Sequence, residues 1–407
     1  MSGMARENLV RIEEIQGRGR AIVSSQPLRG GEIVLRDSPI LLYSAFPLNG
    51  QQLQFSTSIY CDNCFRKLQS ASAPLSCPSC SQHRFCSPNC LSVSIASSHN
   101  TWVCQALSRM RDCPSLVLHQ PMERQIQARF LIAAYNLALV SPSNFQILSS
   151  LQGHGEDKDA VAAQFLHSVI SSLCPPPSIE GFLFSLELTS ALLAKDKLNA
   201  FGIMEPVDFN KENCGQRSVR AYGIYPKASL FNHDCLPNAC RFDYVDNAPD
   251  RNTDVIIRMI HDVPQGREIC LSYFPINENY SSRQKRLLED YGFTCECDRC
   301  KVEANWSDQE DNEGDDDDEE NEAMEEDHDE PMVEEAASEY ETDFPHAYFF
   351  VRYMCNRENC WGTLAPLPSS NVNQSSNLLE CNVCGNIKNE ADDIDADGGQ
   401  GAYSIPH

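Results

Sequence analysis

Three closely spaced cysteines near residue 300 constrain the fold of this chain more than any other feature, because they require a fourth partner from a distant part of the sequence. They stand in the order C-x-C-x-x-C and are Cys295, Cys297 and Cys300. Structural zinc sites are almost always tetrahedral, so three thiolates leave such a site incomplete. Cys235, in the segment Asn232-His-Asp-Cys-Leu-Pro-Asn238, is the natural fourth donor. A zinc ion held there would clamp the later segment over the Asn232-His233 turn and bring Tyr273 and Tyr291 near it.

A second group of cysteines lies between residues 61 and 104, where they are too dense for an ordinary hydrophobic core. Together with one histidine they provide enough soft ligands for two tetrahedral zinc sites, and metal binding at such sites contributes directly to folding. The residues are Cys61, Cys64, Cys77, Cys80, Cys86, Cys90, His99 and Cys104.

The C-terminal cysteines stand in two pairs of unequal spacing. They can form a fourth, ribbon-like zinc site, and the alternative is a pair of surface loops with free thiols. These residues are Cys355, Cys360, Cys381 and Cys384. The other cysteines are expected to be core or near-surface thiols, namely Cys113, Cys174, Cys214, Cys240 and Cys270.

The cysteine spacing also indicates the cellular compartment. Most of the 20 cysteines belong to C-x-x-C type pairs, which are typical of zinc ligands in a reducing compartment rather than of disulfides. Residues 1–20 are polar and lack the apolar stretch of a signal peptide. No apolar run reaches the ~18–20 residues that a membrane span needs. We therefore expect the nucleus and/or the cytoplasm, and no membrane association.

The net charge is concentrated in one segment. Residues 307–343 contain 21 acidic and no basic residues, so the rest of a chain with formal charge −26 is only mildly acidic. Such a segment cannot bury enough apolar surface to fold, and we expect disorder there. With 407 residues the chain can hold two or three domains. Its charge balance does not favour direct DNA binding through a basic face.

Short apolar stretches predict strands on both sides of a helical region. Residues 21–23 and 32–35, separated by a Pro-Leu-Arg-Gly-Gly turn, indicate two hairpin-connected strands. Residues 255–262 and 268–273, around a Pro-Gln-Gly turn, indicate a second antiparallel hairpin. A β domain is therefore interrupted by the cysteine-rich module and by helices.

Between residue 115 and about residue 200 the apolar spacing is helical. One helix is expected to start at Pro121, and Ser178 is expected to cap another. The positions expected to share faces of three successive helices are Ile126, Phe130, Ala134 and Leu137; Val161, Phe165 and Val169; and Phe182, Leu186 and Leu193.

Taken together, these motifs resemble those of SET-domain lysine methyltransferases: N-H-x-C-x-P-N around Cys235, a strand that ends in Ser-Tyr273, and a C-x-C-x-x-C post-SET cluster. Residues 61–104 resemble a MYND zinc finger. A SET domain split by a MYND finger is the arrangement of the SMYD family, and the chain is similar to its shorter plant-type, ASH-related members. The resemblance implies an α+β fold: a β-rich SET domain split by a MYND finger and a helical insertion, with a post-SET zinc cluster.

The resemblance also implies domain boundaries. The SET domain would occupy residues 7–60 and 199–280, the MYND finger 61–104, the helical insertion 105–198 and the post-SET cluster 281–305. The acidic disordered segment would follow at 306–343 and a cysteine-rich segment at 344–407.

Individual site residues follow from the same resemblance. It implies that Tyr273 and Tyr291 are catalytic and that S-adenosyl-L-methionine is bound by Gly17, Arg18, Gly19, Asn199, Asn232, His233, Tyr273 and Phe293. The glycine segment alone could be a simple turn, and each aromatic could be a plain core residue. Asp234 stands where the family more usually has serine.

In the MYND finger the ligands would interleave. Cys61, Cys64, Cys86 and Cys90 would hold one zinc ion, and Cys77, Cys80, His99 and Cys104 the other. One more residue than usual separates His99 from Cys104, so an exposed loop histidine is the alternative for His99. The chain would bind three zinc ions, or four with the C-terminal site.

The function implied is S-adenosyl-L-methionine-dependent methylation of protein lysine side chains, with histones as the expected substrate class. Two alternatives remain. The protein could methylate non-histone proteins, or it could be an adaptor whose MYND finger binds proline-containing peptides. Asn232, His233 and Tyr273 favour the enzyme, because an adaptor has no need of them.

Overall fold

In the computed structural model, the residues described are 9–48, 59–68, 74–153, 160–178, 183–206, 217–247, 251–305, 347–368 and 376–390. The acidic segment 307–343, for which the sequence predicts disorder, lies outside them.

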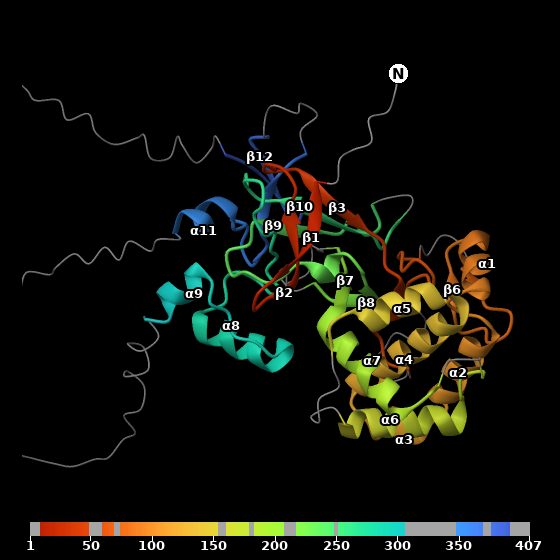
Figure 1. Cartoon of the computed structure of the whole chain (residues 1–407). Coiled ribbons are helices and arrows are strands. Elements are labelled where there is room, and N and C mark those ends of the chain that lie inside the picture. The colour runs from red at the N-terminus through yellow and green to blue at the C-terminus, as the bar shows by residue number, and fades with distance from the viewer. Residues whose placement is uncertain are drawn as a thin grey trace, which may run out of the picture.

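Antiparallel sheets of the β domain combine strands that lie before and after the cysteine-rich module and the helices (Figure 1). The first sheet pairs β1 (Val10–Ile15) with β2 (Gly19–Ser24). In the second, β10 (Val255–Met259) lies between β3 (Ile33–Asp37) and β9 (Ala239–Phe242). In the third, β8 (Val219–Ile224) lies between β4 (Leu41–Ser44) and β7 (Ala200–Met204). Because β3 and β4 find their partners about two hundred residues later, the chain between them is an insertion into one β domain.

The insertion begins with the cysteine-rich module and continues as helices. The module contains β5 (Leu75–Ser76), β6 (Arg84–Phe85) and α1 (Pro88–Ala96). The helices are α2 (Thr101–Arg111), α3 (Pro114–Val117), α4 (Met122–Val140), α5 (Pro142–Ser150), α6 (Ala160–Leu173) and α7 (Leu186–Asn199). In Figure 1 the helices α2–α7 form a block beside the sheets.

The largest apolar core joins this helical block to β4. Leu41 and Tyr43 of β4 are buried in one cluster with side chains of α2, α4, α6 and α7. The Tyr43 hydroxyl donates a hydrogen bond to the buried carboxyl group of Asp196 on α7. Burial raises the pKa of Asp196 to about 7. The helices therefore support the sheet that precedes the Asn232 turn.

The helix predicted to start at Pro121 is confirmed as α4, which follows Pro121 directly and buries Phe130, Ala134 and Leu137. The face predicted for the next helix, α6, is confirmed in part. Phe165 and Val169 pack partly buried against the core, whereas Val161 is 79% exposed. The buried positions of α6 are Ala162, Ala163, Leu166 and Ile170.

The predicted cap of the third helix is also wrong. α7 begins at Leu186, and the capping residue is Ser185, whose hydroxyl accepts a hydrogen bond from the backbone of Leu188 at 3.2 Å. Serine is a good cap at either position, but Ser185 is followed by Glu187 in the first turn, where the helix dipole stabilises a negative charge. Leu193 is buried as expected, whereas Phe182 lies outside the described residues.

Neither predicted hairpin forms. Residues 21–23 pair with β1, and residues 33–35 belong to β3, which pairs with β10. Both edges of β10 are occupied by β3 and β9, so residues 268–271 cannot pair with it. They instead bridge to Val23 and His233. Turn chemistry correctly indicates where the chain reverses, but the apolar surfaces of more distant strands decide the pairing.

The C-terminal half adds two small units around the β domain (Figure 1). After the 3-10 turn η3 (Ala228–Leu230) and strands β9 and β10 come α8 (Tyr280–Arg286), the π-helical turn η4 (Leu287–Tyr291) and α9 (Asp298–Glu303). The last unit contains α11 (Ala347–Tyr353), β11 (Leu364–Pro366), β12 (Leu378–Cys381) and β13 (Ile387–Asn389).

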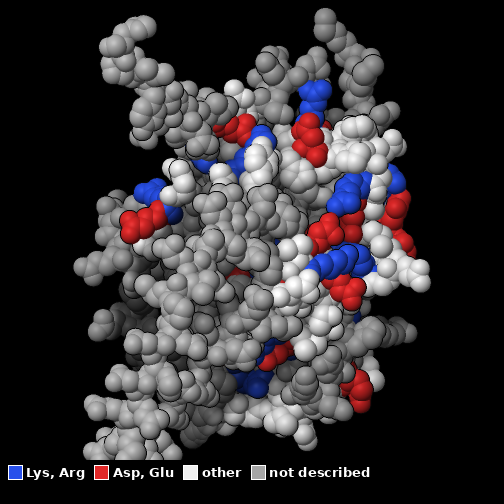
Figure 2. Space-filling model, turned by 90° about the vertical axis from the view of Figure 1, so that its left-hand side faces the viewer, with Lys and Arg blue, Asp and Glu red and all other residues white. Residues whose placement is uncertain are grey.

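The face of the molecule in Figure 2 carries Lys and Arg side chains interspersed with Asp and Glu over its described part. Within the described ranges, no helix combines the length and the apolar character that crossing a membrane requires.

Candidate functional site

A glycine turn forms one wall of the candidate site. The turn between β1 and β2 contains Gly17 and Gly19, whose φ angles of 77° and 71° favour glycine. A Cβ atom added to either glycine would meet nothing within 4 Å, so the turn exposes an open backbone surface. Arg18 holds the turn against the next segment, because its guanidinium donates to the carbonyl oxygen of His233 at 3.0 Å.

The Asn232-His233 turn forms the floor beneath that wall. The Asn232 amide donates to Glu268 Oε1 at 2.8 Å, and Arg18 forms an ion pair with the same carboxylate at 2.9 Å. Backbone hydrogen bonds then join the floor to the segment before Tyr273: Leu271 N–H donates to Asn232 O, and Asp234 N–H donates to Leu271 O, both at 3.0 Å. Glu268 therefore positions two predicted site residues, a role that the sequence analysis missed.

The ring nitrogens of His233 have different partners. The backbone N–H of Tyr273 donates to Nδ1 at 3.2 Å, so Nδ1 accepts, and in the neutral ring Nε2 carries the proton. Burial lowers the pKa of His233 to about 3, which keeps the ring neutral. Nε2 lies 3.2 Å from Cys235 Sγ and can donate to a thiolate there. His233 thus links the floor to Tyr273 and to the cysteine cluster.

Three aromatic residues meet above this floor. The Tyr273 ring lies 4.9 Å from the Tyr291 ring and 5.2 Å from the His233 ring, centroid to centroid. The Tyr273 hydroxyl donates to the backbone oxygen of Phe231 at 2.9 Å, which fixes the orientation of the ring. Phe293 lies 6.4 Å from both His233 and Tyr291 and is 37% exposed, so its ring can still accept a ligand. The structure thus gathers the aromatic residues that the sequence placed at one site.

The local backbone explains how Tyr291 and Phe293 reach the site. The π-helical turn η4 ends at Tyr291, and Gly292 follows in the left-handed conformation with φ of 76°. That reversal turns the chain back, so the N–H of Phe293 donates to Leu287 O at 3.3 Å. Glycine accommodates this conformation without strain.

Beneath the aromatic residues, Cys235 and the three later cysteines come together. Their sulfur atoms all lie within 4.8 Å of one another, with Cys235 Sγ 3.5 Å from Cys300 Sγ and 3.9 Å from Cys295 Sγ. Ligands about 2.3 Å from a tetrahedral zinc ion lie about 3.8 Å apart. Hydrogen bonds from Cys235 and Cys295 lower the pKa of the Cys297 thiol to about 5. The donor set fits zinc.

A fully buried arginine, Arg283, stands beside this cluster. Its Nε donates to Cys235 Sγ at 3.3 Å, and its Nη2 donates to Cys300 Sγ at 3.7 Å and to Glu303 Oε2 at 2.6 Å. Four thiolates around Zn²⁺ carry a net charge of −2, so an arginine at hydrogen-bond distance offsets part of it. No spacing pattern in the sequence pointed to Arg283.

In the cysteine-rich module the structure forms the two interleaved groups that the family resemblance implied. In the first, Cys86 Sγ lies 3.7 Å from Cys64 Sγ and 3.5 Å from Cys90 Sγ. In the second, Cys77 Sγ lies 4.0 Å from Cys104 Sγ, and Cys80 Sγ lies 3.6 Å from His99 Nε2. His99 is 4% exposed, so the alternative of an exposed loop histidine is wrong.

His83 is a further residue that the sequence analysis missed. Its Nδ1 lies 3.3 Å from Cys80 Sγ and its ring centroid 4.0 Å from that of His99. Burial lowers the pKa of His83 to about 2, so its ring is neutral. Its position three residues after Cys80 was the available signal.

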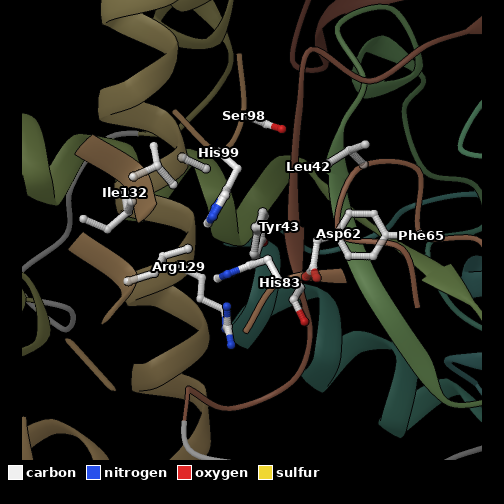
Figure 3. Close-up of a pocket in the computed structure, with 13 residues that line it drawn as sticks. Leu42, Tyr43, Asp62, Phe65, His83, Ser98, His99, Arg129 and Ile132 are labelled. Atoms are coloured by element: carbon white, nitrogen blue, oxygen red, sulfur yellow. The ribbon is translucent and has the colours of Figure 1, made fainter. Parts of the chain in front are cut away.

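Figure 3 shows a pocket where the second cysteine group meets β4 and α4. His83, His99 and Arg129 point into it, across from Asp62 and Phe65. Arg129 donates to the carbonyl oxygens of residues 46 and 47 at 2.9 and 3.1 Å. The pocket therefore belongs to the surroundings of that cysteine group, apart from the aromatic site.

Asn199 was also predicted to bind the cofactor. It ends α7, and its amide donates to the backbone oxygens of Gln152 and Lys195, both at 2.8 Å. The bond to Gln152 holds the segment after α5 against the end of α7, whereas the bond to Lys195 lies within α7. A role of Asn199 toward a cofactor stays a prediction.

Comparisons with known proteins agree on one family. The SET domain family matches residues 19–274. The chain is 57% identical over 406 residues to the histone-lysine N-methyltransferase ASHR2 of Arabidopsis thaliana, covering 95% of this chain and 97% of that protein. It is 25% identical over 300 residues to the histone-lysine N-methyltransferase SMYD3 of Mus musculus, covering 72% of this chain but only 61% of that protein.

Among solved structures, the SET domain of LSMT bound to lysine and AdoHcy is similar over 72% of this chain and 54% of that chain. Its TM-score of 0.32 and identity of 11% are too low to bear on ligands or function.

Proposed function

The chain belongs to the SET-domain family of protein-lysine methyltransferases, and from that premise we propose that it transfers methyl groups from S-adenosyl-L-methionine to lysine side chains of histones, in the nucleus. The observation that carries this proposal is a set of direct contacts: Arg18 of the glycine turn bonds to His233, His233 bonds to the backbone of Tyr273, and the Tyr273 ring packs on the Tyr291 ring. Its similarity to ASHR2 over nearly the whole of both chains supports histones as the substrate class.

The cofactor fits the open part of the site. The exposed turn of Gly17, Arg18 and Gly19, the polar Asn232-His233 floor and the accessible ring of Phe293 offer backbone, amide and aromatic surfaces to an adenosyl group. When bound, S-adenosyl-L-methionine supplies an electrophilic methyl group on a positively charged sulfur. Arg18 and Glu268 hold the floor in place, so little reorganisation is needed on binding.

Methyl transfer requires that the amine of the substrate lysine be neutral and in line with the methyl group, because an ammonium ion has no lone pair. Tyr273 and Tyr291, with ring centroids 4.9 Å apart, would provide apolar walls that exclude water from the lysine side chain. Desolvation lowers the pKa of an amine, which favours its neutral form. The Tyr273 hydroxyl, fixed by the Phe231 carbonyl, would align the amine.

Zinc would be structural in this protein. We assign residues 61–104 to a MYND finger with two zinc ions, held by the two interleaved groups, and one zinc to the post-SET cluster of Cys235, Cys295, Cys297 and Cys300. The post-SET zinc would fix residues 281–305 against the SET core and so keep Tyr291 and Phe293 in place. Binding of a proline-containing peptide by the MYND finger stays a prediction.

Incubation of the full-length protein with labelled S-adenosyl-L-methionine and core histones tests the proposed function. We expect label on histone lysines and a loss of at least about tenfold with Asn232→Ala, because the floor would lose its amide contacts to the cofactor and Glu268. Labelling of other proteins but no histone would contradict the substrate class, and no lysine labelling of any protein would contradict the activity.

The acidic segment 307–343 would attract basic substrates by long-range electrostatics, because it holds 21 acidic residues. Deleting it should lower kcat/KM for histone tails severalfold at low salt and change it little at high salt, where screening removes the attraction. A matched control replaces its Asp and Glu by Asn and Gln at the same length. Equal losses at both salt concentrations, or full activity of the neutral control at low salt, would contradict electrostatic steering.

A further inference from the structure

The C-terminal segment contains a fourth group of four cysteines, remote from the residues of the methyl-transfer site. Cys355 precedes a bend after α11, Cys360 follows it, and Cys381 and Cys384 lie at the turn after β12. Their sulfur atoms all lie within 4.8 Å of one another, with Cys355 Sγ 3.7 Å from Cys384 Sγ and Cys360 Sγ 3.7 Å from Cys381 Sγ. We propose that they bind a fourth zinc ion, and that this zinc ribbon is docked on the SET sheet as part of the fold of the catalytic domain.

The distances fit a tetrahedral metal site rather than disulfides. A disulfide requires about 2.05 Å between sulfur atoms, whereas thiolates on a tetrahedral zinc ion lie about 3.8 Å apart. The backbone N–H groups of Val383 and Cys384 point at Cys381 Sγ from 3.4 and 3.5 Å. Such donors stabilise negative charge on the sulfur.

Two glycines beside the cluster are required for different reasons, Gly362 because there is no room for a side chain and Gly385 because of its backbone conformation. A Cβ atom added to Gly362 would lie 2.3 Å from Cys381 Sγ and 2.9 Å from Val383 Cβ. Gly385, directly after Cys384, has φ of 68°, which favours glycine and turns the chain back after the second cysteine pair. The site therefore depends on these two glycines as well as on its thiols.

The described part of the ribbon has little apolar core to fold around. Besides the cysteines, the fully buried members of its own cluster are Leu364 and Leu379. Small domains with so few buried apolar side chains generally need a metal or disulfides to fold. Since the sulfur atoms are not bonded to one another, zinc is the stabilising group that suits this donor set.

The ribbon is joined to the SET sheet by the residues on either side of Cys381. Glu380 accepts a hydrogen bond from Arg258 of β10 at 2.8 Å and another from the Tyr244 hydroxyl at 2.9 Å. Asn382 donates to the backbone oxygen of Arg241 at 3.2 Å. One tripeptide thus combines a metal ligand with two polar anchors to the catalytic domain, beside the apolar cluster in which Tyr353 and Ala365 pack against Phe242 and Ile256.

Arg258 makes this docking necessary for the sheet as well as for the ribbon. It lies in the central strand β10, is 1% exposed, and stacks over the Phe242 ring at 3.6 Å from the ring centroid. A buried guanidinium without its carboxylate partner is strongly destabilising. If the ribbon unfolded on loss of zinc, Arg258 would lose Glu380, so the SET domain is expected to lose stability with the ribbon metal.

Metal analysis of the full-length protein tests the zinc site, and it does not depend on methyltransferase activity. We expect four zinc ions per chain in the wild type and three in Cys381→Ser. Gly362→Ala should also reduce the content to three while keeping every thiol, because its methyl group collides with Cys381 Sγ. Cys240→Ser, which alters a buried cysteine outside the four groups, should retain four.

Native alkylation followed by mass spectrometry covers the case in which a variant does not fold. Cys384 is only partly buried, so in the wild type its thiol should be protected from iodoacetamide and become reactive once a chelator removes the metal. A content of three zinc ions with Cys384 reactive in the untreated wild type would overturn the fourth site.

The docking is tested separately by Glu380→Gln. This variant should keep four zinc ions and lower the melting temperature by several degrees, because Arg258 loses its counter-ion. Glu390→Gln is the matched control, since Glu390 pairs with Arg352 inside the ribbon unit, and its side chain is more exposed (26%) than that of Glu380 (13%). Equal melting temperatures of the two variants would show that the ribbon does not support the SET sheet.

Discussion

Tyr273→Phe is expected to lower the maximal rate of methyl transfer by about 10²–10³-fold, equivalent to about 3–4 kcal/mol of barrier, while leaving the fold and cofactor binding nearly intact. The phenylalanine ring can keep the contacts of Tyr273 with Tyr291 and His233, whose centroids lie 4.9 and 5.2 Å away. Only the hydroxyl is lost, and with it the bond to Phe231 O that fixes its position toward the amine.

The loss should fall on kcat rather than on cofactor affinity, because the hydroxyl acts on the reacting amine. Single-turnover rates on a verified histone substrate, with the dissociation constant of S-adenosyl-L-methionine measured in parallel, separate the two. Tyr225→Phe is a matched control: this tyrosine is fully buried, and its hydroxyl also donates to a backbone carbonyl, that of Thr253. If Tyr273→Phe turned over near the wild-type rate, Tyr273 would be structural and the assigned active site wrong.

The parts of this site that could be predicted from the sequence are those that depend on local spacing or on the number of ligands that a zinc ion takes. A C-x-C-x-x-C cluster lacks a ligand by count alone, so Cys235 could be chosen before any fold was known. Similarly, the cysteine-rich module and the helices that follow it could be recognised from the sequence as an insertion into a β domain, although the strand pairings on either side of the insertion could not.

What the sequence could not give are contacts made by side chains with no motif of their own. Glu268 joins Arg18 to Asn232, and Arg283 donates to Cys235 Sγ, yet both look like ordinary charged residues in the sequence. Their roles depend on burial and on partners far away in the chain. For Arg283 the decisive fact is complete burial beside thiolates, which only the packed structure reveals.

The strand pairings failed for a related reason. The Pro-Gln-Gly turn before Arg267 does reverse the chain, and the sequence favoured the simplest outcome, a hairpin between its flanks. In the fold, β10 is buried at every position and takes β3 and β9 as neighbours, so residues 268–271 are diverted to Val23 and His233. That diversion places Tyr273 beside His233 and so creates the site.

Cys235→Ser is expected to remove about one zinc ion per chain and to weaken S-adenosyl-L-methionine binding by at least about tenfold, while the two zinc ions proposed for residues 61–104 are retained. Cys235 is 1% exposed and joins the post-SET unit to the Asn232-His233 turn: its Sγ lies 3.5 Å from Cys300 Sγ, 3.3 Å from Arg283 Nε and 3.2 Å from His233 Nε2. A serine hydroxyl is a poor zinc ligand, so the tetrahedral site would be incomplete.

The effect should exceed that of losing an ordinary buried thiol, because binding energy at a structural zinc site is folding energy. Without the metal, residues 281–305 would detach, and Tyr291 and Phe293 would leave the cofactor surface. Cys174→Ser, which alters a buried cysteine of the helical block outside the four groups, is the control and should retain both zinc content and affinity. Metal analysis and calorimetric titration with S-adenosyl-L-methionine measure the two effects. An unchanged zinc content with unchanged affinity would show that Cys235 is not a ligand, and the mutual approach of the four sulfur atoms would then need another cause.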